Sequence, residues 1–205
     1  MQKEIPRKTI YRLSIYLRCL LRLRENKLET VSSEALSKAA GVKSTQLRKD
    51  IAHLGQFGTR GLGYNVETLI KALNEILGAA RLQPVVLVGV GNLGSALMRY
   101  RGFQKEGFEI AAAFDDDHET ANERNVPVAV LPSEQISKFV SENDVKMAIL
   151  AVPANAAQGV ANQLVSAGIQ AILNFSPIIL EVPDEVTVNS VDLALELENL
   201  SYFIR

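Results

Sequence analysis

The pattern of hydrophobic and polar positions along the chain changes near residue 80. Before that point, apolar residues recur every three or four positions, which is the spacing of one helical face. After it, short apolar runs rich in β-branched residues alternate with helical segments, and this alternation predicts a parallel sheet with helices on both faces. We therefore expect an N-terminal domain over 1–80, an α/β domain over 81–188 and a C-terminal helical segment over 189–205.

The N-terminal pattern predicts a helix-turn-helix. A short helix that begins at Ser32 or Ser33 is followed by a turn at Gly41 and by a helix capped by Ser44. Leu36 and Ala39 face inward in the short helix. The later helix directs polar and basic residues outward, as a recognition helix does. Expected helices cover 5–26, 32–40, 44–54 and 68–77, and the outward residues are Gln46, Arg48, Lys49 and His53.

Residues 55–66 read GQFGTRGLGYNV and follow the predicted recognition helix. Four glycines flanked by apolar residues indicate a β-hairpin with a basic tip at Arg60. Such a hairpin is typical of the wing of a winged helix, whose arginine can enter the minor groove of DNA. The segment predicts an α+β winged helix-turn-helix rather than a purely helical domain.

Composition adds a charge asymmetry to this picture. Residues 1–81 hold 15 Lys+Arg against 7 Asp+Glu, whereas the remainder holds 7 against 16, within a net charge of -1. A basic N-terminal region of this kind indicates a polyanionic partner. The lone cysteine, Cys19, and the lack of any long apolar run favour a cytoplasmic protein without a membrane partner.

The stretch VVLVGVGNLGSAL predicts a dinucleotide site. Gly89, Gly91 and Gly94 have the spacing G-x-G-x-x-G between a strand and a helix, where they allow a tight turn and close approach of a pyrophosphate. Asp115 lies 21 residues after Gly94, at the end of the next strand. A carboxylate there can accept hydrogen bonds from ribose hydroxyls, and no Arg or Lys follows it to bind a 2′-phosphate. The motif therefore predicts a Rossmann domain that binds NAD(H).

The rest of the α/β domain offers little catalytic chemistry. Strands are expected over 85–88, 108–114, 126–130, 147–152, 169–174 and 186–188, and helices over 132–140, 155–167 and 192–204. The segments 151–158 and 174–183 leave the carboxyl ends of strands and are apolar and amide-rich. They could hold a nicotinamide without reacting with it, since neither histidine, His53 or His118, is placed as an acid/base. The sequence holds no metal-ligand cluster.

Two other interpretations stay open from the residues alone. An NAD-dependent oxidoreductase could use its basic N-terminal domain for association, although the missing acid/base argues against it. A CoA-binding Rossmann protein is disfavoured by Asp115, because an acid there suits free ribose hydroxyls.

The whole chain resembles the Rex family of redox-sensing transcriptional repressors. The resemblance rests on IYLRCL, SEALSKAAGVKSTQLRKDIAHLGQFGTRGLGY, VVLVGVGNLGSAL, YRGF, FDDD, ILNFSPIILEVP and SVDLALELENLSY. It implies a homodimer with a domain-swapped C-terminal helix, which binds double-stranded operator DNA and releases it when NADH binds. It also implies a regulator and not an enzyme, with NAD(H) as its only cofactor.

The expected site residues fall into three sets. DNA contacts are expected from Ser44, Gln46, Arg48, Lys49, Arg60 and Tyr64. Nucleotide contacts are expected from Gly89, Gly91, Asn92, Leu93, Gly94, Tyr100, Asp115, Val152, Pro153 and Phe175. The resemblance implies a switch in which Asp192 pairs with Arg18 in the DNA-binding form and with Tyr100 when NADH is bound. Residues 117–134 depart from the family pattern, because the usual Pro and Gly are missing after the acidic run.

Overall fold

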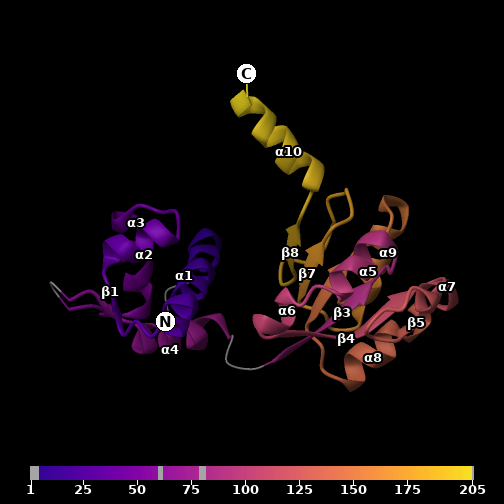
Figure 1. Cartoon of the computed structure of the whole chain (residues 1–205). Helices are drawn as coiled ribbons and strands as arrows, with labels where there is room; N and C mark the ends of the chain where they lie inside the picture. Colours follow the sequence, from indigo (N-terminus) through magenta and orange to yellow (C-terminus); the bar gives the residue numbers. More distant parts are fainter. Residues whose placement is uncertain (1–4, 60–61, 79–81, 205) are drawn as a thin grey trace. The chain divides into compact units, whose positions relative to one another are not determined.

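The computed structural model in Figure 1 describes residues 5–59, 62–78 and 82–204. The chain divides into two compact units, residues 1–81 and 82–205, and each is described by itself. Within the described ranges, no helix combines the length and apolar character needed to span a bilayer.

The first unit is a helical bundle with a small antiparallel sheet. A single apolar core joins its helices, with Leu13, Leu36, Leu47 and Leu69 fully buried. Strands β1 and β2 pair antiparallel through Thr30–Asn65 and Val31–Tyr64. In chain order the elements are α1 (Arg7–Glu25), β1 (Thr30–Val31), α2 (Ser33–Ala39), α3 (Ser44–Ile51), η1 (Ala52–Leu54), β2 (Tyr64–Asn65) and α4 (Val66–Leu77).

Local chemistry explains the helix boundaries in this unit. The Ser32 hydroxyl accepts a hydrogen bond from the Ala35 backbone N–H at 3.0 Å, so Ser32 is the N-cap of α2 as expected. The Asn65 side chain caps α4 in the same way through the N–H of Thr68. The prediction that Ser44 caps α3 was wrong: Lys43 holds that position, and the Ser44 hydroxyl instead bonds the Ser37 hydroxyl at 2.9 Å.

That bond between hydroxyls also corrects the inward face of α2. Ser37 is buried, whereas Ala39, which was expected to face inward, is exposed. The partner hydroxyl at the start of α3 lets a polar residue replace an apolar one at the contact between α2 and α3.

The segment between α3 and α4 forms the predicted wing. Thr59 and Gly63 face each other across an isolated antiparallel bridge, with the Thr59 N–H donating to the Gly63 carbonyl at 2.9 Å. Residues 60–61 at its tip, and with them Arg60, lie outside the described residues.

The second unit is a six-stranded sheet in the order β5-β4-β3-β6-β7-β8, with every neighbouring pair parallel. Numbered along this unit the order is 3-2-1-4-5-6, that of a dinucleotide-binding Rossmann sheet. The strands are β3 (Gln83–Val88), β4 (Phe108–Asp115), β5 (Val130–Pro132), β6 (Met147–Leu150), β7 (Ala171–Asn174) and β8 (Thr187–Ser190). The helices are α5 (Asn92–Met98), α6 (Gly102–Lys105), α7 (His118–Glu123), η2 (Ser133–Gln135), α8 (Ile136–Glu142), α9 (Ala154–Ser166), α10 (Leu193–Ser201) and η3 (Tyr202–Ile204).

Alternate residues of each central strand bury into opposite faces of the sheet. Val86 and Val88 pack in one core with residues of α8 and α9. Val85 and Leu87 pack in another core with residues of α5 and α7. Helices thus cover both faces, as the alternating pattern predicted.

The region after β4 differs most from the predicted elements. The strand expected over 126–130 begins only at Val130, because Asn125 takes a positive φ of 52° and the Asn122 side-chain amide bonds both backbone groups of Val130 at 2.9 Å. The helix expected from Pro132 starts as a 3-10 turn and becomes α-helical only at Ile136.

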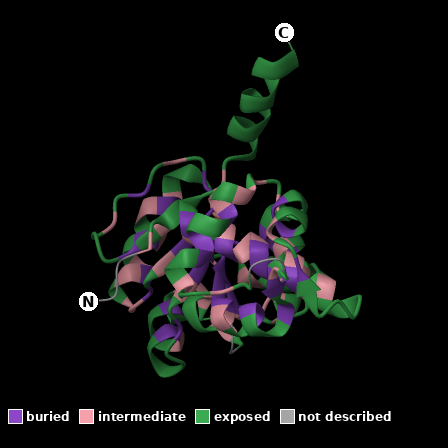
Figure 2. Cartoon of the chain, turned by 90° about the vertical axis from the view of Figure 1, so that its left-hand side faces the viewer, coloured by how far each residue is buried: buried purple, intermediate pink, exposed green. Residues whose placement is uncertain are grey.

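The C-terminal helix α10 is exposed along its length (Figure 2). Asp192, expected within the helix, is its N-cap and accepts from the backbone N–H groups of Ala194 and Leu195 at 2.9 and 3.1 Å. The expected apolar face is present but is uncovered: Leu193, Leu197, Leu200 and Phe203 are 60 to 78% exposed. An uncovered apolar face of this size marks a surface suited to packing against another protein surface.

Candidate nucleotide pocket and DNA-binding surface

The glycine loop links β3 to α5 and is built by close backbone contacts. Gly89 has φ of 93°, and a Cβ there would lie 2.5 Å from the carbonyl oxygen of Ala151. A Cβ at Gly94 would overlap the Gly89 carbonyl oxygen, so α5 packs on the loop only because Gly94 has no side chain. A Cβ at Gly91 would meet nothing within 4 Å, which leaves open space above the loop. This is the arrangement that a pyrophosphate requires.

Asp115 lies at the end of β4 and holds the glycine loop from beside it. Its Oδ2 accepts from the Val90 backbone N–H at 2.6 Å, and its Oδ1 accepts from the Asp117 N–H at 3.0 Å. Sequence reasoning expected Asp115 to face a ribose but missed this second role. The acid in the motif therefore also fixes the loop that would bind the phosphates.

A cavity of about 480 Å³ opens at the carboxyl edge of the sheet, between the glycine loop and the ends of β4, β6 and β7. Its size suits a small ligand or cofactor. Apolar side chains form most of its wall, and Asp115 and Asp116 supply charge at one side. Among the expected nucleotide contacts, the cavity brings together Gly89, Gly91, Leu93, Asp115, Val152, Pro153 and Phe175, while Asn92 and Gly94 adjoin it in α5.

The apolar end of this cavity is fixed by a network of polar side chains behind it. The hydroxyl of Ser176 donates to the Val152 carbonyl at 2.7 Å, and the Asn174 side-chain carbonyl accepts from the Ser176 N–H at 2.9 Å. Both residues are buried. They hold the segments after β6 and β7 together.

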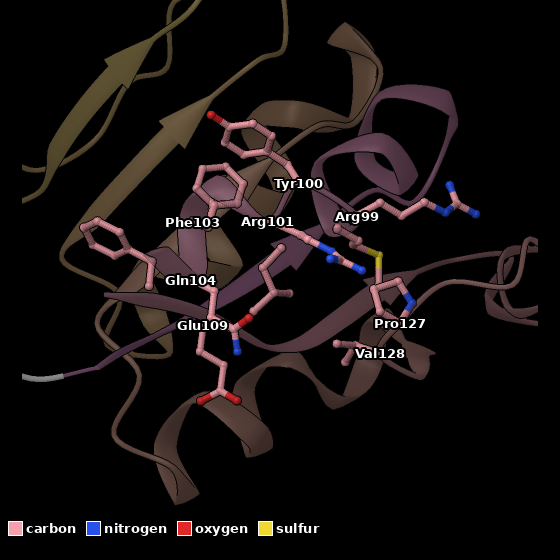
Figure 3. Close-up of a pocket in the computed structure, with 11 residues that line it drawn as sticks. Arg99, Tyr100, Arg101, Phe103, Gln104, Glu109, Pro127 and Val128 are labelled. Carbon is pink, nitrogen blue, oxygen red and sulfur yellow. The ribbon is translucent and has the colours of Figure 1, made fainter. Parts of the chain in front are cut away.

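Tyr100 lies elsewhere in the protomer. It borders a second hollow of about 510 Å³, whose lining mixes apolar residues such as Phe103 with charged residues such as Arg101 and Glu109 (Figure 3). The rings of Tyr100 and Phe103 meet edge to face with centroids 5.1 Å apart. Tyr100 is 60% exposed and does not line the cavity of the glycine loop. Tyr100 is thus separate from the glycine-loop cavity, and its expected nucleotide contact stays a prediction.

The atypical segment 117–134 turns back onto the glycine loop through two arginines. Arg124 Nη1 donates to Asn92 Oδ1 at 3.1 Å. Arg99 at the end of α5 donates to the backbone carbonyls of Arg124 and Asn125. Sequence reasoning missed this link, since the two arginines are 25 residues apart.

The recognition-helix candidate α3 presents cations to solvent. Arg48 and Lys49 are exposed, and Arg48 Nη1 donates to the Ser33 hydroxyl at 3.1 Å. This hydrogen bond borders a shallow hollow of about 400 Å³ formed by the start of α2, Arg48 and the wing. Tyr64, expected to contact DNA, is only 6% exposed and packs beneath Gly58, but it also borders this hollow, and its DNA contact stays a prediction.

Behind these cations lies a buried charged cluster that sequence reasoning missed. Asp50 is 1% exposed and accepts from Arg12 Nε and Nη2 at 2.6 and 2.7 Å, and from the Tyr16 hydroxyl at 2.8 Å. Gln46 Nε2 donates to the same carboxylate at 2.9 Å. Burial alone would raise the pKa of Asp50, but the hydrogen bonds from Arg12, Tyr16 and Gln46 outweigh it and lower the pKa.

The signal for this cluster was present in the sequence. Asp50 falls between Leu47 and Ile51 on the inward face of α3, and an acid on an apolar face needs a buried partner. Arg12 and Tyr16 lie one turn apart on α1 and supply that partner.

The remaining switch residues lie on separate elements. Arg18 is exposed on α1, and Asp192 begins α10. Among the described residues, no group of three or more His, Cys, Asp or Glu side chains could hold a metal ion.

Comparison with known proteins decides the family. Residues 4–52 match the family model "Putative DNA-binding protein N-terminus", and residues 81–178 match the CoA binding domain model. A redox-sensing transcriptional repressor Rex from Desulforamulus reducens is 48% identical over 97% of this chain and 95% of its own. The chain belongs to the Rex family.

Solved Rex structures agree with this assignment along the full chain. The crystal structure of RSP in complex with beta-NAD+ and operator DNA has 37% identity and a TM-score of 0.88, over 98% of this chain and 93% of its own. RSP in complex with beta-NADH has 36% identity and a TM-score of 0.85, over 98% and 95%. The Rex repressor from Streptomyces coelicolor is 46% identical over 98% of this chain and 78% of its own. The predicted family, winged helix and Rossmann domain are confirmed.

Proposed function

We propose that this Rex-family chain is a cytoplasmic homodimeric repressor that binds operator DNA and is released when NADH binds. One observation carries the proposal: a winged helix with exposed cations and a glycine-loop cavity with Asp115 occur in one chain. Its relative RSP has been crystallised with NAD+ and operator DNA and with NADH. It is a regulator and not an oxidoreductase, since its relatives are named as repressors.

The nucleotide site is assigned to the cavity beside the glycine loop. Open space above Gly91 suits the pyrophosphate, and Asp115 suits the ribose hydroxyls. The apolar wall at Val152, Pro153 and Phe175 suits a neutral reduced nicotinamide better than a cationic oxidised one. If NADH binds one form of the dimer more tightly than the other by a few kcal/mol, its binding is enough to change which form prevails.

The DNA contact is assigned to α3 and the wing. Arg48 and Lys49 supply the charge, and Ser44 and Gln46 lie in the first turn of α3, where a recognition helix meets bases. Arg60 is proposed to enter the minor groove. In a dimer, two such helices must be about 34 Å apart to reach successive major grooves.

The exposed face of α10 is proposed to pack on a second copy in a domain-swapped arrangement, with residues 189–205 as the dimerisation segment. Uncovered Leu193, Leu197 and Leu200 support this role. Across that dimer, Asp192 is proposed to pair with Arg18 in the DNA-binding form and with Tyr100 in the NADH-bound form.

A DNA-binding titration tests the proposal. A palindromic operator would be titrated with and without NADH at two salt concentrations. We expect binding that weakens steeply with salt and is lost on adding NADH. Salt-sensitive binding that ignores NADH would contradict the redox-sensing role. Absence of DNA binding together with turnover of NADH on a carbonyl substrate would favour the oxidoreductase.

A further inference from the structure

We propose that Asp50 is a positioning residue that fixes the recognition helix α3 on α1 and thereby determines how well operator DNA is distinguished from other DNA. The inference rests on the proposed function, because it concerns the same DNA-binding surface. Of the residues that the structure describes, Asp50 is the buried side chain with a formal charge. It immediately follows Arg48 and Lys49, the proposed DNA contacts.

The geometry of the cluster is directional. Arg12 binds both carboxylate oxygens of Asp50 through Nε and Nη2, a two-point contact that fixes the guanidinium and carboxylate in one plane. The Tyr16 hydroxyl, one turn further along α1, binds Oδ2 at 2.8 Å. The Thr9 hydroxyl, earlier on α1, donates to Oδ1 at 3.5 Å, so donors from three residues of α1 converge on one side chain of α3. A rotation or slide of α3 on α1 would break them together.

The apolar contacts of α3 do not supply this directionality. Leu47 and Ile51 are buried against the same core, but hydrophobic burial depends on area and hardly on angle. A buried ion pair often adds little net stability over apolar residues of similar volume, and in some proteins it instead selects one packing arrangement. The Asp50 cluster is a buried, hydrogen-bonded ion pair, so it can select one packing arrangement of α3 on α1.

The Asp50 carboxylate also binds a side chain of the proposed DNA-binding surface. Gln46 Nε2 donates to Asp50 Oδ1 at 2.9 Å, so the side chain in the first turn of α3 is oriented by the cluster. An ionised carboxylate only accepts hydrogen bonds, which directs the amide nitrogen of Gln46 inward. Base readout needs side chains held to within about 10–20°. Loss of the cluster would relax this surface without removing any cation from it.

The test separates positioning from stability by an apolar replacement. Arg12→Met, Tyr16→Phe and Asp50→Leu are combined, so that no charged side chain is left unpaired in the core. Wild-type protein first selects its operator from a library of duplexes with randomised palindromic half-sites. Affinities are then measured for the selected operator and for a scrambled duplex of equal length, with melting temperature and NADH affinity measured on the same samples.

We expect the ratio of operator to scrambled affinity to fall about ten-fold or more, against a usual specificity ratio of roughly 10³ to 10⁷. Affinity for the scrambled duplex, the salt slope and NADH affinity should stay within about two-fold, because the exposed cations and the second unit are unchanged. The matched control is Arg24→Met with Glu67→Leu. It removes an exposed pair of 3.8 Å between α1 and α4 and should leave the ratio unchanged.

An unchanged ratio in the folded triple variant would overturn the inference. If that variant melts below the assay temperature, folded Arg12→Lys decides instead: it keeps the charge but loses the two-point contact, and its ratio should fall at least about three-fold. An unchanged ratio there would equally overturn the inference. If wild-type protein selects no sequence from the library, the proposed function itself fails, so the two failures are distinguishable.

Discussion

The two units recognise their partners by opposite means. In the first unit, side chains project from α3 and are oriented from behind by a buried charged cluster around Asp50. In the second, backbone contacts shape the glycine loop, where Gly89 and Gly94 lack side chains at points of close contact, and apolar side chains form most of the cavity wall. The buried polar residues near that site, Asn174 and Ser176, are uncharged. The proposed DNA-binding surface therefore depends on side-chain hydrogen bonds, whereas the proposed phosphate-binding loop depends on backbone shape.

Replacing Gly94 by Ala should break the backbone side of this comparison most severely. The new Cβ would overlap the Gly89 carbonyl oxygen, so that α5 must move away from β3. We expect a loss of more than about 4 kcal/mol in the free energy of unfolding, the range of the most disruptive substitutions. NADH binding should be abolished. Thermal unfolding and NADH titration by fluorescence measure the two effects.

Gly91→Ala and Gly159→Ala are the matched controls, because a Cβ at either position meets nothing within 4 Å. Gly91→Ala should fold normally yet bind NADH poorly, since its methyl group occupies the space assigned to the pyrophosphate. Gly159→Ala, within α9, should bind NADH normally. Normal NADH binding by Gly94→Ala would show that the glycine loop is not the cofactor site.

Arg12→Ala tests the charged side of the comparison. It leaves Asp50 buried without its principal partner, which should lower the free energy of unfolding by about 3 kcal/mol. Because the folded-state pKa of Asp50 is lowered in the wild type, its stabilising contribution is present above the ordinary pKa of about 3.9 and is lost as the pH falls below it. In Arg12→Ala, the effect of burial is opposed less, so the pKa of Asp50 should rise. As the pH falls from 7, the Asp50 carboxylate of the variant should then be protonated before that of the wild type, which removes its unpaired buried charge.

The difference in melting temperature between wild type and Arg12→Ala should therefore be largest near pH 7 and narrow toward pH 4. Thermal melts over this range measure it. Arg24→Ala, which removes an exposed cation, provides the control with little effect at any pH. A difference that widens on acidification would contradict the assigned ionisation of Asp50.

Arg48→Ala sharpens the contrast between surface and core. It removes an exposed cation without touching the buried cluster, so we expect operator affinity to fall by about 1–3 kcal/mol, or roughly 5- to 150-fold. Melting temperature and NADH affinity should not change. Lys71→Ala on α4 removes an equally exposed charge outside α3 and serves as the control. Equal losses from the two variants would indicate a diffuse electrostatic effect in place of a specific contact.

The sequence predicted the elements that follow from the hydrophobic pattern and from the glycine motif. Apolar runs gave the central strands β3 and β6, and the G-x-G-x-x-G spacing located the cavity because its glycines are needed by the local backbone. The strand expected over 126–130 was misplaced, since a side chain of Asn122, rather than a run of apolar residues, determines where β5 begins.

Contacts between distant segments were harder to foresee. The Asp50 cluster joins residues 34 and 38 positions apart, and periodicity within one helix carries no information about its partner. The burial of Tyr64 was also not foreseen: this wing residue was expected at the DNA surface, and it is 6% exposed beneath Gly58 while still bordering the hollow beside Arg48. Exposure depends on the packing of the whole unit, which the spacing of residues does not fix.

Arg124→Ala should produce the smallest effect and tests whether the backbone site receives any support from side chains. Arg124 Nη1 donates to Asn92 Oδ1 at 3.1 Å and links the atypical 117–134 segment to the start of α5. Both residues are exposed, so the link should contribute less than about 1 kcal/mol. We expect NADH and NAD+ affinities to fall together by about two- to five-fold, leaving their ratio unchanged, because Arg124 lies away from the apolar wall assigned to the nicotinamide. Calorimetric titration of both nucleotides measures this, with Arg101→Ala at the second hollow as the control. A change in the ratio would place Arg124 in the redox response itself, and unchanged affinities would show that the glycine loop needs only its own backbone and Asp115.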